Sequence, residues 1–445
     1  MKKGLVLCGG GSKGSYEMGA WKALYELGEA YEIVTGTSIG CLNAAMYAQH
    51  EYESCLELWN KIEVGMIMES GFNFDTSSIK QELKKKNDML KFFGKYVTNM
   101  GSDIKPFINL MDEYIDEEKI KNSDITLGMC CAKFPSLKGV EVVANKDMAP
   151  GLIKKYILAS ASCFPVFPVC KIEKESYIDG GYYDNLPINF AIDLGATDIT
   201  VIDLSENITH KEYLNKPFIR YIHPRRSLGS FMLFDQTVIQ NNLTLGYNDT
   251  MKAFGKYIGL RYTFKPLNKK LEALAIDSKV FRPFILNISR LVGHIKRNKL
   301  KSKVLPEKAG DIFNILEELA DGKPMTDAMY ALRALEIAGE IVAMNDLKVY
   351  DFLEFFHKII DTLFSYKDDS NLLDGYNILN VNKQKDFLYK LDDKKLLRYI
   401  LNKAIGNFAI DTDFIINLAL SKPRVFIAYF ILKSINEIGD FTSEN

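Results

Sequence analysis

Residues 33–48 constrain the fold of this chain more than any other segment, and their sequence is IVTGTSIGCLNAAMYA. The first of them are apolar and β-branched, which is typical of a buried strand, and the alanine-rich end is typical of a helix. Between them stands the pattern Gly-x-Ser-x-Gly of a nucleophile elbow, a sharp turn that projects a serine hydroxyl out of a sheet. The segment therefore predicts a strand, a turn at Ser38 and a helix.

The elbow comprises Gly36, Thr37, Ser38, Ile39 and Gly40. Glycines two residues before and after the serine let the strand and helix backbones pass each other without a Cβ clash. The N-terminus of the following helix favours negative charge near the serine hydroxyl. An ordinary turn is the alternative interpretation, because glycine and serine are common in turns, and the segments before and after decide between the two.

A glycine-rich loop precedes the elbow, between a predicted strand at residues 3–8 and a predicted helix at residues 16–25. Its members are Gly9, Gly10, Gly11, Ser12, Lys13 and Gly14. Backbone N–H groups at the start of a helix form an anion-binding site. The loop is therefore a candidate for holding a negatively charged group.

This loop has four interpretations. The spacing Gly9-x-Gly11-x-x-Gly14 fits a dinucleotide fingerprint, but the acidic residue expected at the end of the second strand is absent. A phosphate loop needs a lysine after its last glycine, where this chain has Ser15. A tight turn without a ligand stays open. An oxyanion hole whose N–H groups face Ser38 fits best.

The composition bounds the remaining possibilities. At 445 residues the chain is expected to form two domains, and 56 basic against 57 acidic residues call for no nucleic-acid partner. The seven cysteines contain no C-x-x-C pair and the five histidines are dispersed, so we expect reduced thiols and no metal site. The apolar run at residues 425–432 is too short to span a membrane, and residues 1–20 lack a signal peptide, which favours a cytoplasmic protein.

Downstream of the elbow the pattern alternates between strands and helices. Strands are predicted at 125–132, 139–143 and 199–204, and helices at 151–160 and 188–194. Two prolines within residues 161–169 predict a rigid loop instead of a central strand. This alternation is typical of an α/β fold with a mainly parallel sheet.

A third motif, Asp179-Gly180-Gly181, follows a short apolar segment. Two glycines after an aspartate at a strand end allow another backbone to approach closely. A plain turn is the alternative for this motif by itself.

In this order and spacing, the glycine loop, the elbow and the Asp-Gly-Gly motif resemble the patatin-like phospholipases. The resemblance extends through Ala159–Ser162 and Asn185–Pro187, and it covers residues 3–265. Many members of the family carry arginine where this chain has Lys13, and both side chains are cationic. The resemblance implies a three-layer α/β domain at residues 1–265, while helical periodicity predicts an all-α C-terminal domain of unknown role at residues 266–445.

The resemblance also implies a chemistry that uses no cofactor. Ser38 and Asp179 would form a catalytic dyad without histidine, in which Asp179 accepts the serine proton as the serine oxygen attacks an ester. Amides of Gly10 and Gly11 would bind the oxyanion, and water would cleave the acyl-enzyme. The expected substrate is a carboxylic ester of a phospholipid or lysophospholipid.

Several alternatives remain open from the sequence. If the chain is not a hydrolase, it is either a catalytically silent lipid-binding or interaction module or a nucleotide-binding protein. Lys13 is either a salt-bridged structural residue or a contact for an anionic head group. Residues 50–120, with Met66, Met68, Phe72 and Phe74, are either core or an access lid. The basic stretch 296–303 is either a solvated linker or a transient contact with an anionic membrane surface.

Overall fold

The computed structural model describes residues 2–68, 104–266, 276–299, 311–366, 371–376, 381–405 and 411–436. They divide into two compact units, unit 1 at Met1–Phe254 and unit 2 at Gly255–Asn445. The predicted domain boundary after residue 265 stays a prediction. The unit boundary lies earlier because Thr263–Phe264 forms a strand, β9, that pairs with β10 at Val349–Tyr350.

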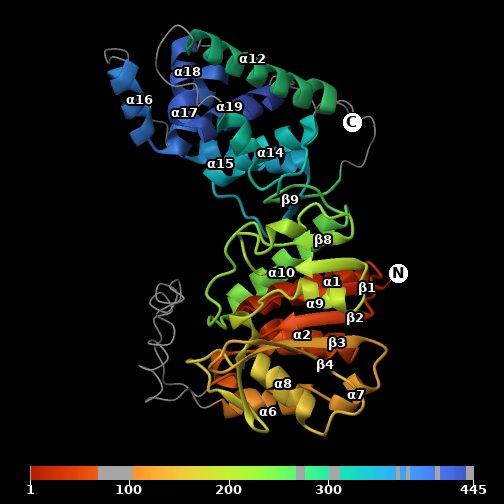
Figure 1. The fold of residues 1–445 in the computed structure, drawn as a ribbon. Coiled ribbons are helices and arrows are strands. Elements are labelled where there is room, and N and C mark those ends of the chain that lie inside the picture. The colour runs from red at the N-terminus through yellow and green to blue at the C-terminus, as the bar shows by residue number, and fades with distance from the viewer. Residues whose placement is uncertain are drawn as a thin grey trace. The chain divides into compact units, whose positions relative to one another are not determined.

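Unit 1 is built on one eight-stranded sheet in the order β5-β6-β3-β2-β1-β7-β8, with β4 paired to β3 (Figure 1). Strands β3, β2, β1, β7 and β8 are parallel to one another. Strands β4 and β6 each pair antiparallel with β3, and β5 pairs antiparallel with β6. The strands are β1 Lys3–Leu7, β2 Ile33–Thr37, β3 Thr126–Lys133, β4 Gly139–Val143, β5 Cys170–Ile172, β6 Glu175–Asp179, β7 Asp198–Ile202 and β8 Ile219–Ile222. The expected mainly parallel α/β sheet is confirmed.

Helices cover both faces of this sheet, which gives three layers. Successive side chains of a strand point to opposite faces. On β1, Leu5 and Leu7 face Met18 and Trp21, whereas a Cβ at Gly4 would meet Ala191. The helices of unit 1 are α1 Ser15–Glu26, α2 Ile39–Ala48, α3 Tyr52–Lys61, α6 Lys105–Tyr114, α7 Glu117–Lys121, α8 Leu152–Ser160, α9 Ile188–Asp193 and α10 Gln236–Ala253, with short 3-10 turns η1 Gly11–Gly14, η2 Val64–Met66, η3 Gly180–Tyr182 and η4 Lys211–Tyr213.

The strand register brings the three sequence motifs together. Parallel pairing sets Leu7 beside Gly36, so the glycine loop after β1 and the elbow after β2 leave the same edge of the sheet. On the other side of β2, Thr37 pairs with Cys130 of β3. Antiparallel pairing of β3 with β6 then sets Asp179 beside Cys131. Motifs about 140 residues apart in sequence thus share one end of the sheet.

Unit 2 is helical, as expected for the C-terminal region, apart from the two-residue strands β9 and β10. Its helices are η5 Asp277–Phe281, α12 Arg282–Lys299, α13 Asp311–Glu317, α14 Asp327–Ile341, α15 Phe352–Ser365, α16 Val381–Lys390, α17 Asp393–Ile405, α18 Thr412–Ser421 and α19 Pro423–Asn436. The apolar run at 425–432 lies in α19, where most of its side chains are buried in the core of this unit. The run is therefore core.

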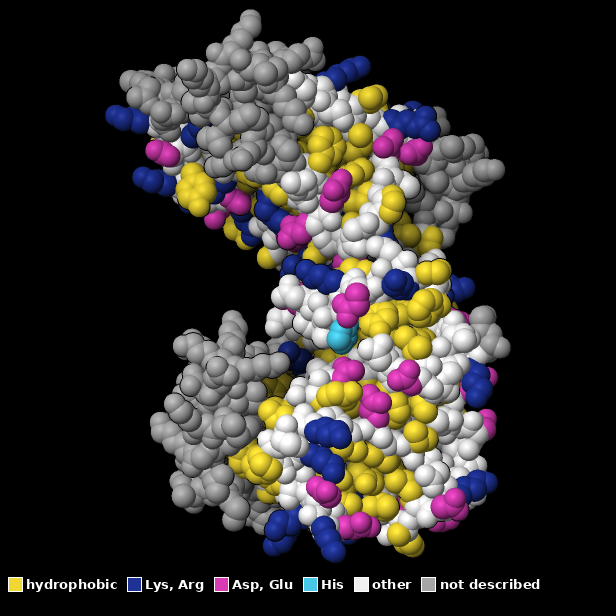
Figure 2. Space-filling model, in the orientation of Figure 1, with side chains coloured by type: hydrophobic (Ala, Val, Ile, Leu, Met, Phe, Trp, Pro, Cys, Tyr) yellow, Lys and Arg dark blue, Asp and Glu magenta, His cyan; other side chains and the backbone are white. Residues whose placement is uncertain are grey.

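Only parts of the basic stretch and of the candidate lid lie within the described residues. Residues 296–299 of the basic stretch belong to helix α12 and not to a linker, while residues 300–303, Phe72 and Phe74 lie outside the described residues. Lid and membrane-contact roles stay predictions. On the face shown in Figure 2, basic and acidic side chains are interspersed, in keeping with the balanced composition. Among the described helices, none combines the length and apolar character that crossing a membrane requires.

Candidate active site

Ser38 occupies a strained turn between β2 and α2. Its backbone φ of 55° and ψ of −124° lie in a region that L-residues rarely adopt, at a typical cost of about 1–3 kcal/mol. The flanking glycines allow this turn. A Cβ at Gly36 would lie 2.3 Å from the carbonyl oxygen of Gly40, and a Cβ at Gly40 would lie 2.6 Å from that of Cys8. The predicted elbow geometry is therefore present.

A side chain from α8 fixes the backbone of the elbow. The N–H of Ser38 donates to the hydroxyl oxygen of Ser160 over 2.9 Å, and that hydroxyl donates to the carbonyl oxygen of Cys130 over 2.6 Å. Two residues on, the carbonyl oxygen of Ser162 accepts from the N–H of Asp179 over 2.9 Å. The segment after α8 thus ties the serine to the aspartate. Ala159–Ser162 is part of the family resemblance, but its sequence alone predicts no such role.

Asp179 is a buried carboxyl group, 5% exposed, at the end of β6. The N–H of Gly181 donates to its Oδ1 over 2.7 Å. Burial raises the pKa of Asp179 to about 6, while hydrogen bonds from the Gly181 amide and the Ser38 side chain lower it. Gly180 is required next to it, since a Cβ there would lie 2.2 Å from the carbonyl oxygen of Cys130. Asp179 is thus a carboxylate at neutral pH that binds a proton more readily than an exposed aspartate.

We expect Asp179→Asn to stabilise the fold at about pH 8 by as much as ~3 kcal/mol, because the native chain must keep a charge buried there. The folded-state pKa lies above the unfolded one, so wild-type stability falls as pH rises from about 4 to about 6 and stays lower above. Urea unfolding of both proteins at several pH values measures this. An Asn variant less stable than wild type at about pH 8, or a difference that grows below about pH 4, would contradict the burial cost.

The glycine loop faces the elbow with two unused amides. The N–H groups of Gly9, Ser12 and Lys13 donate to carbonyl oxygens of Asn185, Phe231 and Gly10 respectively. Within the described part of the chain, the amides of Gly10 and Gly11 donate to no protein atom. Glu32, the nearest acid to the second strand, accepts from the N–H of Lys3 at the start of β1, far from the loop. The ribose contact of a dinucleotide site is therefore missing.

Asn185 holds the loop in place from the segment after the Asp-Gly-Gly motif. Its backbone oxygen accepts from the N–H of Gly9 over 2.9 Å, and its side-chain amide donates to the Gly9 oxygen over 3.0 Å. A Cβ at Gly9 would lie 2.3 Å from the Asn185 Oδ1. Asn185 is part of the family resemblance, but its role at the loop could not be predicted from sequence, because it and Gly9 are 176 residues apart.

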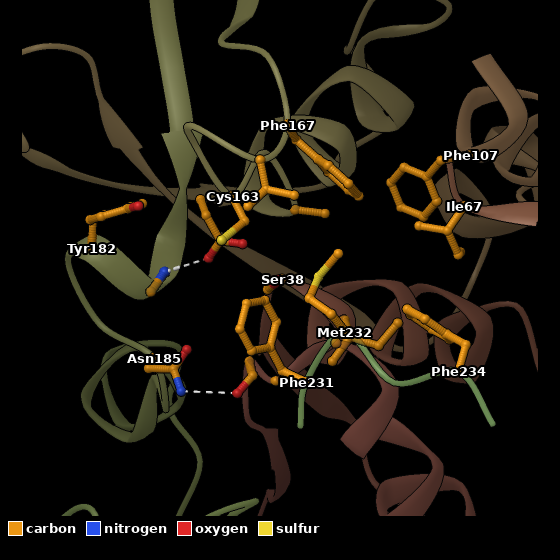
Figure 3. A pocket seen from close by; sticks show the side chains of 18 residues that line it. Ser38, Ile67, Phe107, Cys163, Phe167, Tyr182, Asn185, Phe231, Met232 and Phe234 are labelled. Carbon is orange, nitrogen blue, oxygen red and sulfur yellow. Dashed lines mark hydrogen bonds between the residues drawn. The ribbon is translucent and has the colours of Figure 1, made fainter. Parts of the chain in front are cut away.

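Ser38, Asp179 and the glycine loop line one cavity of 280 Å³ (Figure 3). Asp179 is the one charged side chain among the described residues that line it, and no histidine does. The remaining wall is mostly apolar and comes from the segment after η2, α6, the loop before β5 and the segment before α10. It includes Ile67, Phe107, Val166, Phe167, Met232 and Phe234. Of the other predicted site residues, Ser12 and Gly14 are buried beneath the loop and Lys13 lies outside this lining.

Metal chemistry gains no support from the described residues, where no group of three His, Cys, Asp or Glu side chains is placed to hold an ion. The described cysteines are all free thiols, and most of them are buried. Cys163 lines the cavity, but burial raises the pKa of its thiol far above neutrality. The Cys163 thiol is therefore protonated at neutral pH.

Residues 5–192 match the family described as "Patatin-like phospholipase". "Lysophospholipase nte1" of Aspergillus terreus is 26% identical over 206 residues, which cover 45% of this chain and 12% of that protein. "Patatin-like phospholipase domain-containing protein 7" of Rattus norvegicus is 27% identical over 202 residues, which cover 45% of this chain and 13% of that protein. The match thus spans about one eighth of these relatives' length.

Among solved structures, "Crystal structure of VipD from Legionella pneumophila" has a TM-score of 0.38 and 16% identity, covering 96% of this chain and 91% of that one. The family match covers the end of β1, the glycine loop, the elbow and the Asp-Gly-Gly motif in one continuous stretch. Residues 5–192 thus match the patatin-like phospholipase family.

Proposed function

We propose that unit 1 is a serine hydrolase that cleaves carboxylic esters of lipids through Ser38 and Asp179. One observation carries the proposal: Ser38, on a strained turn, and the buried carboxyl group of Asp179 line one cavity, and burial raises the pKa of that carboxyl group to about 6. A base near this pKa is ionised at neutral pH and still accepts a proton during the reaction. The relatives named lysophospholipase and patatin-like phospholipase support a lipid substrate.

The reaction follows from the positions of these groups. The Ser38 oxygen attacks the ester carbonyl carbon while its proton moves to Asp179, and the carbonyl oxygen becomes negative. The free amides of Gly10 and Gly11 donate to that oxygen. The C–O bond then breaks, and the alcohol leaves with the proton from Asp179. Water next attacks the acyl group on Ser38, giving its proton to Asp179, which returns it to the serine oxygen as the acid departs.

The apolar cavity wall supports a lipid as the substrate of this chemistry. Phe107, Phe167 and Phe234 offer no hydrogen bond to a polar substrate, and burying an acyl chain against them is favourable by about 0.8 kcal/mol per methylene group. The same wall keeps water from Asp179, which maintains its raised pKa. A phospholipid or lysophospholipid carries such a chain.

The first test is covalent labelling by a fluorophosphonate with an alkyl chain. We expect wild type to gain one adduct, which peptide mass spectrometry assigns to Ser38, because the reagent mimics the tetrahedral intermediate and needs an activated serine. Ser162→Ala, which removes another serine close to the site, is the matched control and should label normally. A catalytically silent binding module would take up no label, or label equally in wild type and Ser38→Ala.

A further inference from the structure

The cavity has two ends of different chemistry. Figure 3 shows Tyr182, Asn185 and the hydrogen-bonded groups on one side of Ser38, and Ile67, Phe107, Phe167 and Phe234 on the other. On the second side, the rings of Phe107 and Phe167 contact each other with centroids 6.0 Å apart. Since Phe107 comes from α6 and Phe167 from the loop before β5, two separate elements meet there.

Burial shows which end is closed. Ile67, Phe107 and Phe167 are 4%, 3% and 7% exposed although they line the cavity, so solvent does not enter past them. At the polar end, Gly181 is exposed and Tyr182 and Asn185 are half-buried. The mouth therefore lies at the polar end, beside the reacting groups, and the apolar end is blind.

The size of the cavity limits what it holds. Pockets for drug-sized ligands measure about 300–1,000 Å³, and this one measures 280 Å³. Among the described residues, its lining carries no cation for a phosphate and no polar side chain at the blind end. A charged head group or a second chain would leave its polar atoms unpaired or find no room. One hydrocarbon chain satisfies both conditions.

We propose that the blind end binds the acyl chain of the substrate and that the Phe107–Phe167 contact sets the longest chain accepted, while the alcohol leaves through the polar mouth. This inference rests on the proposed ester hydrolysis and adds the orientation of the substrate to it. A chain longer than the cavity would have to separate the two rings, which are packed within the core. Shorter chains would leave apolar wall in contact with water.

The test measures kcat/KM for p-nitrophenyl esters from acetate through butyrate, octanoate and laurate to palmitate. We expect Phe107→Ala and Phe167→Ala each to raise the ratio of palmitate to butyrate by about tenfold or more, because they lengthen the cavity. Val166→Leu adds volume to the wall and creates no void, so it should lower this ratio by a similar factor. Leu233→Ala is the control, since Leu233 is 45% exposed and outside the lining.

A second series separates the two ends. Naphthyl butyrate and p-nitrophenyl butyrate share an acyl chain and differ in the alcohol, so the cavity variants should leave their ratio unchanged. A changed alcohol preference in these variants would reverse the orientation and overturn the inference. Unchanged chain-length ratios in all three variants, with butyrate still hydrolysed, would overturn it while sparing the proposed function. Absence of both hydrolysis and fluorophosphonate labelling in wild type would instead refute the hydrolase itself.

Discussion

Replacing Ser38 by alanine or Asp179 by asparagine is expected to lower kcat for a soluble ester by about 10⁴–10⁶, because members of one catalytic unit fail together when either is removed. Alanine removes the attacking oxygen. Asparagine can still accept the hydrogen bond of the Gly181 amide but cannot take the serine proton at neutral pH. The double variant should therefore be no slower than either single variant. If the two residues contributed independently, their effects on kcat would instead multiply.

Two further measurements make this prediction specific. In wild type, kcat/KM should fall about tenfold per pH unit below about 6, where Asp179 becomes protonated. Asp184→Asn is the matched control, since Asp184 lies five residues further on and its Oδ1 accepts from the N–H of Leu186, which asparagine also accepts. Its turnover should stay near that of wild type. Near-normal turnover in Asp179→Asn, measured on folded protein, would remove the aspartate from the mechanism.

The stability of the same asparagine variant should move in the opposite direction. A buried carboxylate destabilises the fold at neutral pH, so the inactive variant is expected to unfold at higher denaturant concentration than wild type. This single substitution would then lower activity and raise stability. If Asp179 were purely structural, its replacement would lower stability because hydrogen bonds would be lost. Turnover would then fall only as far as the fraction of folded protein falls.

Much of this site could be predicted from sequence because its parts are local. The glycine loop, the elbow and the Asp-Gly-Gly turn each need particular residues at fixed offsets, and Gly36, Gly40 and Gly180 stand where a Cβ would strike a backbone atom. The parallel pairing of β1, β2 and β3 agrees with the predicted alternation of strands and helices. Each motif could thus be recognised before its neighbours in space were known.

The remaining features depend on contacts between distant segments, for which the sequence carries no local pattern. The hydrogen bond between Ser38 and Ser160 joins residues 122 positions apart. The cavity wall draws Phe107 from a helix and Phe234 from the segment before α10, where the aromatic residues resemble ordinary core. The raised pKa of Asp179 arises from burial, which a sequence motif does not report. The size of the acyl site could therefore not be anticipated.

Gly11→Ala is expected to lower kcat by about 10²–10³, the usual effect of losing an oxyanion donor, with a smaller change in KM. Gly11 has a φ of +56°, and a Cβ there would lie 2.1 Å from the carbonyl oxygen of Phe231. That oxygen also accepts from the N–H of Ser12 over 2.8 Å, so it cannot retreat without breaking the bond that holds the loop. The loop must move instead, and its free amides move with it.

Two other glycines provide controls that distinguish movement of the loop amides from backbone strain and from the added methyl group itself. A Cβ at Gly10 would lie 2.8 Å from the tip of the Leu204 side chain, and the φ of 172° there suits any residue, so Gly10→Ala should retain more turnover. Gly28 has a φ of +71° with nothing within 4 Å of its Cβ position, so Gly28→Ala reports backbone strain alone and should leave kcat unchanged. Thermal melts confirm folding of each variant. If folded Gly11→Ala kept its kcat and only raised KM, the loop would bind the substrate in its ground state, and the oxyanion would have to be stabilised by other donors.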